Sequence, residues 1–447
     1  MLGFERAPVR PPGGPGELLR VESAMGAGPR TRFDLWLAGI CASRVFNGLV
    51  FMSYAAAIPL LQREWNMSGA QAGAISSGFQ LGYAVSLVAC SSLADRVSPK
   101  KVYLWSLFLA GVAALAFALL AGDFLSGLVL YTVVGLALGG TYTTGVMIIA
   151  DQYTPSSRGM AVGCFIASTS CGYALSLLLS GLALPSGGYK LSFLLTCSGP
   201  LAGWVLAFLT LRSTRVDGAG RQEGERFTRE VLRNRRAMLL IWGYTFHNWE
   251  LQGMWAWTPA FLAACLAAAG AAQLQAAGSG AQMTSLFHLM GLVSSFSMGA
   301  LSDRMGRRTV MLAMAGLSTV CSFLFGWSIG LPLAVVLGLG GIYAFSSLGD
   351  SPVLSAALTE SVKPSYLGSA LGLRSLMGFG AGAVAPLVFG AILDLTNPGT
   401  KGSYETWGWA FSALGLGGAA AVWTIGKLGK GETGGHGDAG RGVRSEE

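Results

Sequence analysis

Charged residues are scarce in this chain. Lys, Arg, Asp and Glu make up 12% of its 447 residues, whereas a soluble domain usually carries about 25%. So few charged residues cannot cover the surface of a water-soluble protein of this length. We therefore exclude a soluble enzyme, a nucleic-acid-binding protein and a disordered protein, although the net charge is +8. With 52% hydrophobic residues, the composition indicates a membrane protein with many spans.

Motifs of catalysis and metal binding are missing as well. The sequence has no HExxH, no GxSxG with triad partners and no P-loop, which disfavours a membrane-embedded enzyme and an ATP-driven pump. The seven Cys include no CxxC pair, and we interpret them as packing residues rather than disulfides or metal ligands. We expect no enzymatic activity, no cofactor and no bound metal.

Long runs without charge are what the sequence contains instead. A run of about 20 apolar residues crosses a bilayer as a helix, and backbone groups in lipid must be paired within the segment. The runs lack the polar alternation of barrel strands. The fold class that we predict is an all-α membrane protein, and the segment Ala267–Gly280 is expected to be a turn. Twelve transmembrane helices are predicted at 34–61, 69–92, 102–121, 125–150, 160–184, 191–211, 237–266, 281–300, 309–329, 333–359, 366–392 and 407–426.

The distribution of Lys and Arg predicts the orientation of these helices. Of the 30 basic residues, 25 fall in segments on the same side as the two termini, and only Arg63, Lys190 and Lys401 fall on the other side. Basic residues concentrate in cytoplasmic loops. We therefore expect a monomer in the cytoplasmic (inner or plasma) membrane, with both termini in the cytoplasm and the lipid bilayer as its surroundings.

The chain consists of two similar halves. Leu93-Ala94-Asp95-Arg96 recurs 208 residues later as Leu301-Ser302-Asp303-Arg304, which predicts two pseudo-symmetric six-helix bundles. The predicted division is a disordered N-terminus at 1–32, bundles at 33–211 and 237–427, a central cytoplasmic loop at 212–236 and a disordered tail at 428–447. The N-terminal stretch lacks the apolar core of a signal peptide.

The second copy of this repeat resembles the loop signature of a known family. Gly299-Ala300-Leu301-Ser302-Asp303-Arg304-Met305-Gly306-Arg307-Arg308 resembles the G-x-L-a-D-R-x-G-R-[KR] loop of the major facilitator superfamily (MFS). The first copy keeps Asp95, Arg96 and Lys100 but has neither glycine. The resemblance implies a secondary transporter with alternating access, and it implies that Asp95, Arg96, Asp303, Arg304 and Arg308 control the conformational change. Plain positive-inside topology would also explain the cations.

Four charged residues lie well inside predicted spans, where facing lipid would cost several kcal/mol, on the order of 2.5–3.5 on insertion scales. They are Arg44, Glu250, Asp350 and Arg374. Each is therefore expected to face a partner or a watery cavity. The resemblance implies that the first, fourth, seventh and tenth helices line the central cavity, and three of the four charges lie on helices of that set.

The spacing around Arg44 and Glu250 defines the candidate binding residues. Arg44, Asn47 and Tyr54 share a helical face, and a buried guanidinium suits a carboxylate. His247 and Glu250 also share a face, where a change of protonation would serve proton coupling. The alternative is a structural ion pair between Glu250 and Arg44. His247 and Glu250 could also ligate a metal, but two ligands alone are weak evidence for a metal site.

Asp350 and Arg374 are expected at similar depths. Two hypotheses remain open for them, a structural salt bridge between the two and a role in substrate binding or proton coupling.

The function that we predict is secondary active transport of a small solute, with an organic anion and proton symport as the favoured form. A proton-coupled exporter of drugs or metabolites is the main alternative, although the stretch Gly163–Gly172 in the fifth predicted helix lacks the proline of the antiporter signature. A sensor that binds solute without moving it is disfavoured, because the cytoplasmic segments are short.

Overall fold

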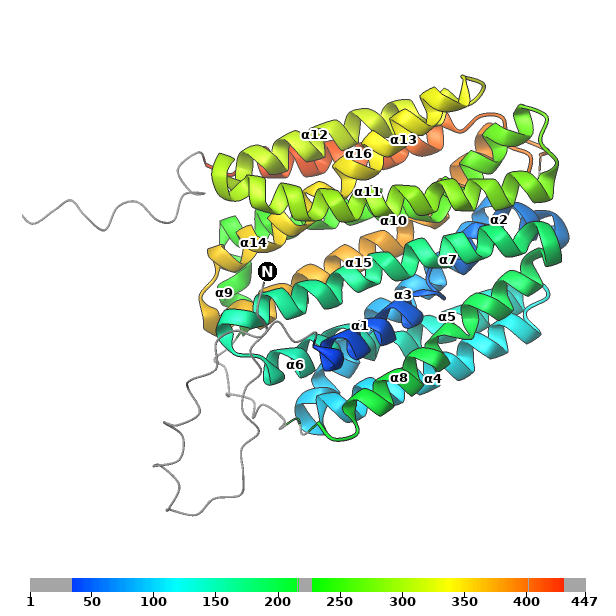
Figure 1. Cartoon of the computed structure of the whole chain (residues 1–447). Helices are drawn as coiled ribbons and strands as arrows, with labels where there is room; N and C mark the ends of the chain where they lie inside the picture. Colours follow the sequence, from blue (N-terminus) through cyan, green and yellow to red (C-terminus); the bar gives the residue numbers. More distant parts are fainter. Residues whose placement is uncertain (1–33, 215, 217–226, 401, 430–447) are drawn as a thin grey trace, which may run out of the picture.

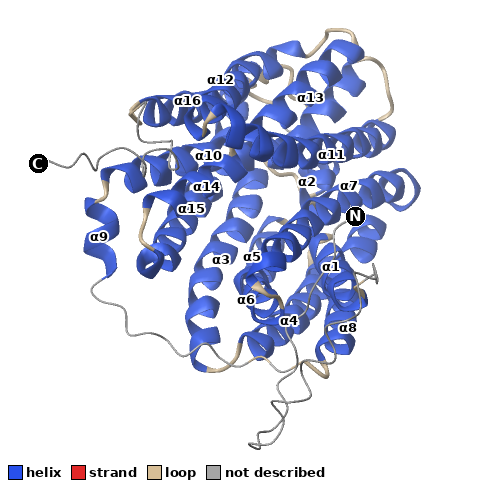
Figure 2. Ribbon diagram, turned by 60° about the vertical axis from the view of Figure 1, so that its left-hand side comes forward, coloured by secondary structure: helices blue, strands red, loops and turns tan. Residues whose placement is uncertain are grey.

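The computed structural model describes residues 34–214, 216, 227–400 and 402–429. The predicted N-terminal segment 1–32 and residues 430–447 of the predicted tail lie outside the described residues. Helices make up the regular structure of the described chain (Figures 1 and 2). They are α1 (Leu35–Gly48), α2 (Ser53–Glu64), α3 (Gly69–Arg96), α4 (Pro99–Leu120), α5 (Phe124–Leu138), η2 (Gly139–Thr141), α6 (Tyr142–Gln152), α7 (Pro155–Cys197), α8 (Gly199–Leu211), α9 (Phe227–Arg233), α10 (Arg235–Ala268), α11 (Gln273–Met305), α12 (Arg307–Phe325), η3 (Gly326–Ser328), α13 (Leu333–Gly349), α14 (Ser351–Ser361), α15 (Pro364–Thr396) and α16 (Gly408–Gly426).

Ten helical stretches of the described chain are long and apolar enough to cross a membrane. One of them, Ser157–Leu211, reverses direction at Gly187 and Gly188, where the backbone leaves helical geometry. The positive φ of Gly188 is a conformation that glycine adopts without steric cost. With the more polar α10 as a further crossing, the described residues form twelve spans, as the sequence predicts.

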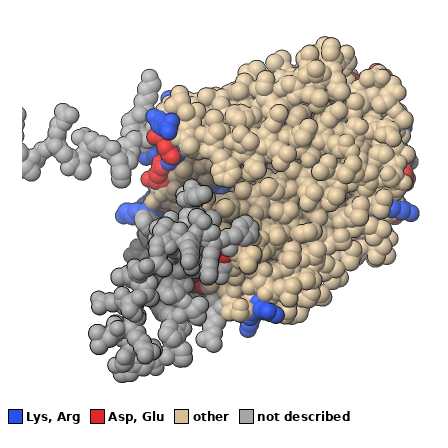
Figure 3. Space-filling view, viewed as in Figure 1, with Lys and Arg blue, Asp and Glu red and all other residues tan. Residues whose placement is uncertain are grey.

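The surface matches a membrane setting. Large apolar side chains such as Leu120, Val293 and Phe296 are exposed, which is expected where lipid replaces water. In the view of Figure 3, charged residues gather at the two ends of the molecule and the surface between them is uncharged. The protein is therefore a multi-pass membrane protein.

Several spans are interrupted where the sequence predicts one continuous helix. The first breaks at 49–52, the fourth contains the 3-10 turn Gly139–Thr141, and the tenth breaks at Asp350. The predicted turn at Ala267–Gly280 is wrong in its extent, since α11 already begins at Gln273. Alanine and glycine made this segment resemble a loop, but alanine favours a helix and tertiary packing against α7 extends it.

We name the two ends of the bundle by their charge. The basic end carries the start of α1, the end of α16 and α9, at the left of Figure 1, and the opposite end carries α2. Lys100 donates to the carbonyl of Thr214 at the basic end (2.9 Å), so α4 begins where α8 finishes. The short helix α9 lies within the predicted central loop.

The two halves meet along two pairs of helices, α3 with α15 and α7 with α11 (Figure 2). Glycines permit close backbone approach near the opposite end. A Cβ added to Gly278 on α11 would lie 2.7 Å from the carbonyl oxygen of Gly181 on α7, which is closer than real Cβ atoms come. The halves are therefore in tight contact at this end.

The same helices stand apart nearer the basic end. A Cβ added to Gly159 or Gly163 of α7, or to Gly368 or Gly372 of α15, would meet no described atom within 4 Å. The halves are in close contact at the opposite end, whereas these glycines nearer the basic end have open space around them.

Candidate functional site

Arg44 lies in the centre of the first half, on α1. Its side chain is buried, with 2% of its surface exposed. Nε donates to the hydroxyl of Thr169 (2.9 Å) and Nη1 to that of Thr141 (3.1 Å). Among the described residues no carboxylate lies within ion-pair distance of it, so the alternative ion pair with Glu250 is not formed. A buried guanidinium with neutral partners keeps an uncompensated charge that favours an anion.

Thr141 is held in place by the 3-10 turn that interrupts the fourth span. Its hydroxyl donates to the carbonyl of Leu138 (2.8 Å) and accepts from Asn47 Nδ2 (3.3 Å) as well as from Arg44. Oδ1 of Asn47 is buried and has no described hydrogen-bond partner. Buried polar atoms are nearly always paired, so this oxygen is available to a ligand. Asn47 therefore lies beside Arg44, as its spacing predicts.

Tyr54 does not share this location. The break at 49–52 removes the helical register between Arg44 and Tyr54, so their spacing no longer places them on one face. The Tyr54 hydroxyl donates to the carbonyl of Ala72 on α3 (3.1 Å). Tyr54 instead lines a small inner cavity near the opposite end, together with Gln252 and Trp255.

Arg374 of α15 supplies a second cation, from the other half. Nη1 donates to the hydroxyl of Ser355 (2.6 Å), and the guanidinium lies 4.2 Å from the centre of the Tyr244 ring. Its Nε is buried without a described hydrogen-bond partner. Tyr142 lies within electrostatic range of both Arg44 and Arg374. Tyr142 thus lies near two cations that come from opposite halves.

Aromatic and amide side chains bridge the halves beside this region. Tyr83 of α3 meets Phe379 of α15 edge-on, with ring centres 5.5 Å apart. Gln80 donates to Gln252 on α10 (3.0 Å). Aromatic rings offer both apolar area and edge or face contacts to a flat ligand. This layer lies between the basic end and the closed opposite end.

Asp350 and Arg374 form no salt bridge with each other, so this one of the two hypotheses for the pair is wrong. Asp350 instead pairs with His247 Nδ1 at 3.0 Å, and both side chains are buried. The break between α13 and α14 places Asp350 against α10, whereas Arg374 points to Ser355 one helical turn further on. His247 Nε2 has no described hydrogen-bond partner, so this pair has one free nitrogen.

Glu250 points into the interior of the second half. Oε1 accepts from the Ser318 hydroxyl on α12 (2.8 Å), and a Cβ on Gly418 of α16 would lie 2.5 Å from Oε2. Glu250 is 4% exposed, and no cation is paired with it among the described residues. It therefore lies among α10, α12 and α16, away from Arg44. It is one turn from His247 but has different partners.

The predicted gating residues differ between the two loop copies. Asp303 pairs with Arg307 (2.6 Å), which also pairs with Glu360 (3.0 Å), and Arg308 donates to the carbonyl of Gly426 (2.9 Å). Asp95, Arg96 and Arg304 are exposed, and no hydrogen bond or ion pair joins them to other described residues. All second-copy contacts stay within the second half.

The opposite end is held shut by bonds between the halves. Asp394 of α15 accepts from the backbone N–H groups of Gly69 and Ala70 (2.7 and 2.8 Å) at the start of α3. A carboxylate at a helix N-terminus is favoured by the helix dipole. Tyr404 donates to Asp394 (3.2 Å) and accepts from Gln62 (2.8 Å). Burial, together with the nearby carboxyl of Asp394, raises the pKa of the Tyr404 hydroxyl, which therefore keeps its proton for this bond.

Several residues of these sites were missed by sequence reasoning. Thr141 and Tyr142 follow two consecutive glycines in an apolar span. Such a glycine pair indicates an interruption of the helix. Arg307 belongs to the loop that resembles the family signature, but it is not one of the predicted gating residues. Ser355 and Asp394 carry no local signal. Among the described residues no group of three or more metal-ligating side chains is clustered.

Comparison with known proteins finds a matching family and similar transporters. The profile of the Major Facilitator Superfamily matches residues 40–281 and 270–437. The chain is 26% identical over 385 residues to the probable sulfoacetate transporter SauU of Cupriavidus necator, covering 79% of this chain and 84% of the relative. It is 25% identical over 422 residues to the 4-hydroxybenzoate transporter PcaK of Pseudomonas aeruginosa, covering 84% and 88%.

Solved structures are similar in fold. The nucleoside transporter NupG superposes with a TM-score of 0.67 at 15% identity, covering 88% of this chain and 98% of that one. A bacterial homologue of the lysosomal transporter Spinster, in an inward-facing and unoccupied conformation, gives a TM-score of 0.64 at 18% identity, covering 88% and 95%.

Proposed function

The chain belongs to the Major Facilitator Superfamily, and from this premise we propose that it is a secondary transporter that carries a small organic anion together with protons. The anion binds between Arg44 of the first half and Arg374 of the second. Rocking of the halves then exposes this region to one side of the membrane at a time.

The observation that carries the proposal is the environment of Arg44. A permanently charged group is buried against hydroxyls and rings, and no described acid balances it. Burying an unpaired charge is costly, and an anionic substrate would supply the missing partner. Arg374, with an unpartnered Nε, provides the second hydrogen-bonding cation.

The relatives support a carboxylate or sulfonate as the substrate class. Their printed names include transporters of sulfoacetate, gentisate, 4-hydroxybenzoate and niacin, which are small acids. Three of these acids contain an aromatic ring, and the rings of Tyr83 and Phe379 beside the arginine pair suit a flat substrate.

We propose that the direction is uptake, because a proton symporter carries its substrate along the inward proton gradient. The basic end, with its excess of Lys and Arg, would be the cytoplasmic end by the positive-inside rule, which would place both termini in the cytoplasm.

The second half provides the groups for proton symport. The His247–Asp350 pair and Glu250 are buried groups whose charge changes on protonation, and their charge affects the packing of α10 against α12 and α13. Protonation and substrate binding are coupled if each state of α10 favours a different arrangement of the halves.

Uptake into proteoliposomes tests the proposal. The purified protein is reconstituted and supplied with radiolabelled sulfoacetate, niacin, gentisate and 4-hydroxybenzoate, which we call the acid panel. We expect accumulation of at least one acid against its gradient when the external side is more acidic. Collapse of the pH gradient by a protonophore should abolish accumulation but leave exchange of external for internal substrate. No uptake of any acid would overturn the substrate class, and accumulation that survives the protonophore would overturn proton coupling.

A further inference from the structure

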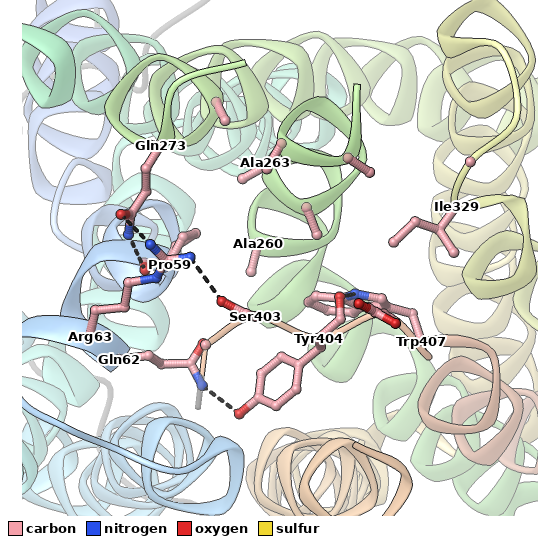
Figure 4. Close-up of a pocket in the computed structure, with 17 residues that line it drawn as sticks. Pro59, Gln62, Arg63, Ala260, Ala263, Gln273, Ile329, Ser403, Tyr404 and Trp407 are labelled. Atoms are coloured by element: carbon pink, nitrogen blue, oxygen red, sulfur yellow. Dashed lines mark hydrogen bonds between the residues drawn. The ribbon is translucent and has the colours of Figure 1, made fainter. Parts of the chain in front are cut away.

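A second cavity, of about 420 Å³, lies at the opposite end (Figure 4). It is formed between α2 of the first half and α10, α11 and the 402–407 loop of the second. Ala260, Ala263 and Ala264 contribute an apolar wall on α10, and Arg63, Gln273 and Ser403 provide polar groups. A cavity with an apolar wall and a few converging polar groups is the usual form of a small-molecule site.

Arg63 is the cation of this cavity. Nη1 donates to Gln273 Oε1 (2.7 Å) and Nη2 to the Ser403 hydroxyl (2.9 Å), as Figure 4 shows. Both acceptors are neutral. Glu405 also lines the cavity, but no described carboxylate lies within ion-pair distance of Arg63. A carboxylate would add Coulomb attraction and two parallel hydrogen bonds to the guanidinium, which the two separate neutral acceptors do not supply.

The cavity stands in line with the inner cavity that Tyr54 borders. Pro59 and Ala260 line the outer cavity, and Ala55 and Ala256, each four residues deeper, line the inner one. Four residues of helix span about 6 Å. Only about one helical turn of packed side chains from α2 and α10 therefore separates the two spaces.

The bonds of Arg63 also connect the two halves. Arg63 belongs to α2, whereas Gln273 begins α11 and Ser403 lies between α15 and α16. An anion that takes over the guanidinium removes two of the bonds that hold this end shut. Binding there is thereby linked to opening, because a ligand shifts an equilibrium toward the state it binds more tightly.

We propose that this outer cavity is an entry site for the transported organic acid, with Arg63 as its anion-binding residue, and that occupancy weakens the closed end. The inference rests on the proposed function. An acid arriving from outside binds Arg63 first, with its apolar body against the alanine wall. It moves on to the arginine pair when the halves separate at this end.

Protection of an engineered thiol tests binding at this site. Ala268→Cys places an exposed thiol on the cavity lining, and Ala271→Cys places one at the same end outside the lining. Each variant is placed in lipid nanodiscs and labelled with a charged maleimide, with and without the best-transported acid of the panel, after subtraction of the parent's labelling. We expect labelling at 268 to slow at least threefold and labelling at 271 to stay unchanged.

Charge variants identify the binding group. Arg63→Gln should remove the protection at 268, and Lys190→Gln, which removes another exposed cation at this end, should preserve it. In uptake assays we expect Arg63→Gln to raise KM about tenfold and Arg63→Lys to raise it less. Protection that survives Arg63→Gln, or equal slowing at 268 and 271, would overturn the entry site.

A double variant separates binding from simple closure. Gln273→Ala with Ser403→Ala removes both acceptors and leaves the cation, so KM should stay level or fall. If this double variant raised KM as Arg63→Gln does, Arg63 would act only by holding the halves together and the inference would fail. Absence of uptake of every panel acid by the wild-type protein would instead be a failure of the proposed function.

Discussion

The two halves of this molecule bury their charges in different ways. The first half holds Arg44 against threonine hydroxyls and aromatic rings, with no described acid beside it. The second half holds His247 against Asp350 and Glu250 against Ser318. The first arrangement keeps a fixed charge available to a ligand, and the second contains groups whose charge depends on protons. We therefore propose that the second half alone provides the coupling groups, whereas each half contributes one cation to the substrate site.

The two ends show a similar contrast. At the opposite end, the start of α3 is held by Asp394 from the other half. At the basic end, Asp95 at the other end of α3 is exposed and has no described partner, and Asp303 pairs within its own half. The contacts that cross between the halves are therefore concentrated at the closed end.

Replacement of Arg44 should have the largest effect. Arg44→Gln removes the fixed charge and keeps hydrogen-bonding capacity, and loss of a buried charged partner costs about 2–5 kcal/mol. We expect kcat/KM for uptake to fall about 100-fold or more, since each 1.4 kcal/mol is about tenfold. Arg44→Lys should recover part of the activity. Normal uptake by well-folded Arg44→Gln protein would remove this residue from the site.

Replacement of Glu250 should separate coupling from translocation. Glu250→Gln keeps the bond to Ser318 but cannot change charge, so gradient-driven accumulation should be abolished while counterflow continues. Asp350→Asn should behave in the same way if the His247 pair carries the proton. Gradient-driven accumulation and counterflow are both measured on the same preparation of each variant. Normal accumulation in Glu250→Gln would exclude Glu250 from the coupling mechanism, and loss of both activities would indicate a structural role.

Replacement of Arg374 should weaken binding less than replacement of Arg44. Its side chain is only partly buried, so water can replace part of the lost interaction, and we expect about a tenfold rise in KM for Arg374→Gln. Ser355→Ala is the matched control, because it removes the hydroxyl that positions Arg374 and keeps the charge. An equal or greater effect of Ser355→Ala would argue that position, not charge, is what matters.

Replacement of Asp394 should have the smallest effect. Asp394→Asn removes a charge from the N-terminus of α3, an interaction of about 0.3–2 kcal/mol. We expect the population open at the opposite end to rise a few-fold, measured as a longer distance between spin labels at Leu125 and Leu331, which are both exposed. Asp123→Asn is the control, since Asp123 bonds to Ser126 in its own half. Equal shifts in both variants would refute the role of Asp394.

The sequence predicts best those features that depend only on neighbouring residues. Apolar length identifies each span, and twelve spans in two bundles and the family were confirmed. The individual charges inside the spans were also found from sequence alone, because charge in lipid is costly wherever it occurs. The division of the chain at 211 and 237 and the roles of the site residues stay predictions.

Partners were harder to predict, because they depend on breaks in the helices and on rotation of one helix against another. Because the first span is interrupted at 49–52, Tyr54 does not lie on the same helical face as Arg44. Because the tenth span is interrupted at Asp350, this side chain contacts His247 and not Arg374. Asp394 lies 324 residues from Ala70 along the chain, and no periodicity connects such positions.

A double-mutant cycle on substrate binding tests the central claim most directly. Affinity for the best-transported acid of the panel is measured by equilibrium binding for the wild-type protein, Arg44→Gln, Arg374→Gln and the double variant. If both cations hold one anion, the losses should not add, and the double variant should bind more tightly than their sum predicts by about 1–2 kcal/mol. Strictly additive losses, or unchanged affinity in either single variant, would contradict a shared anion site between the halves.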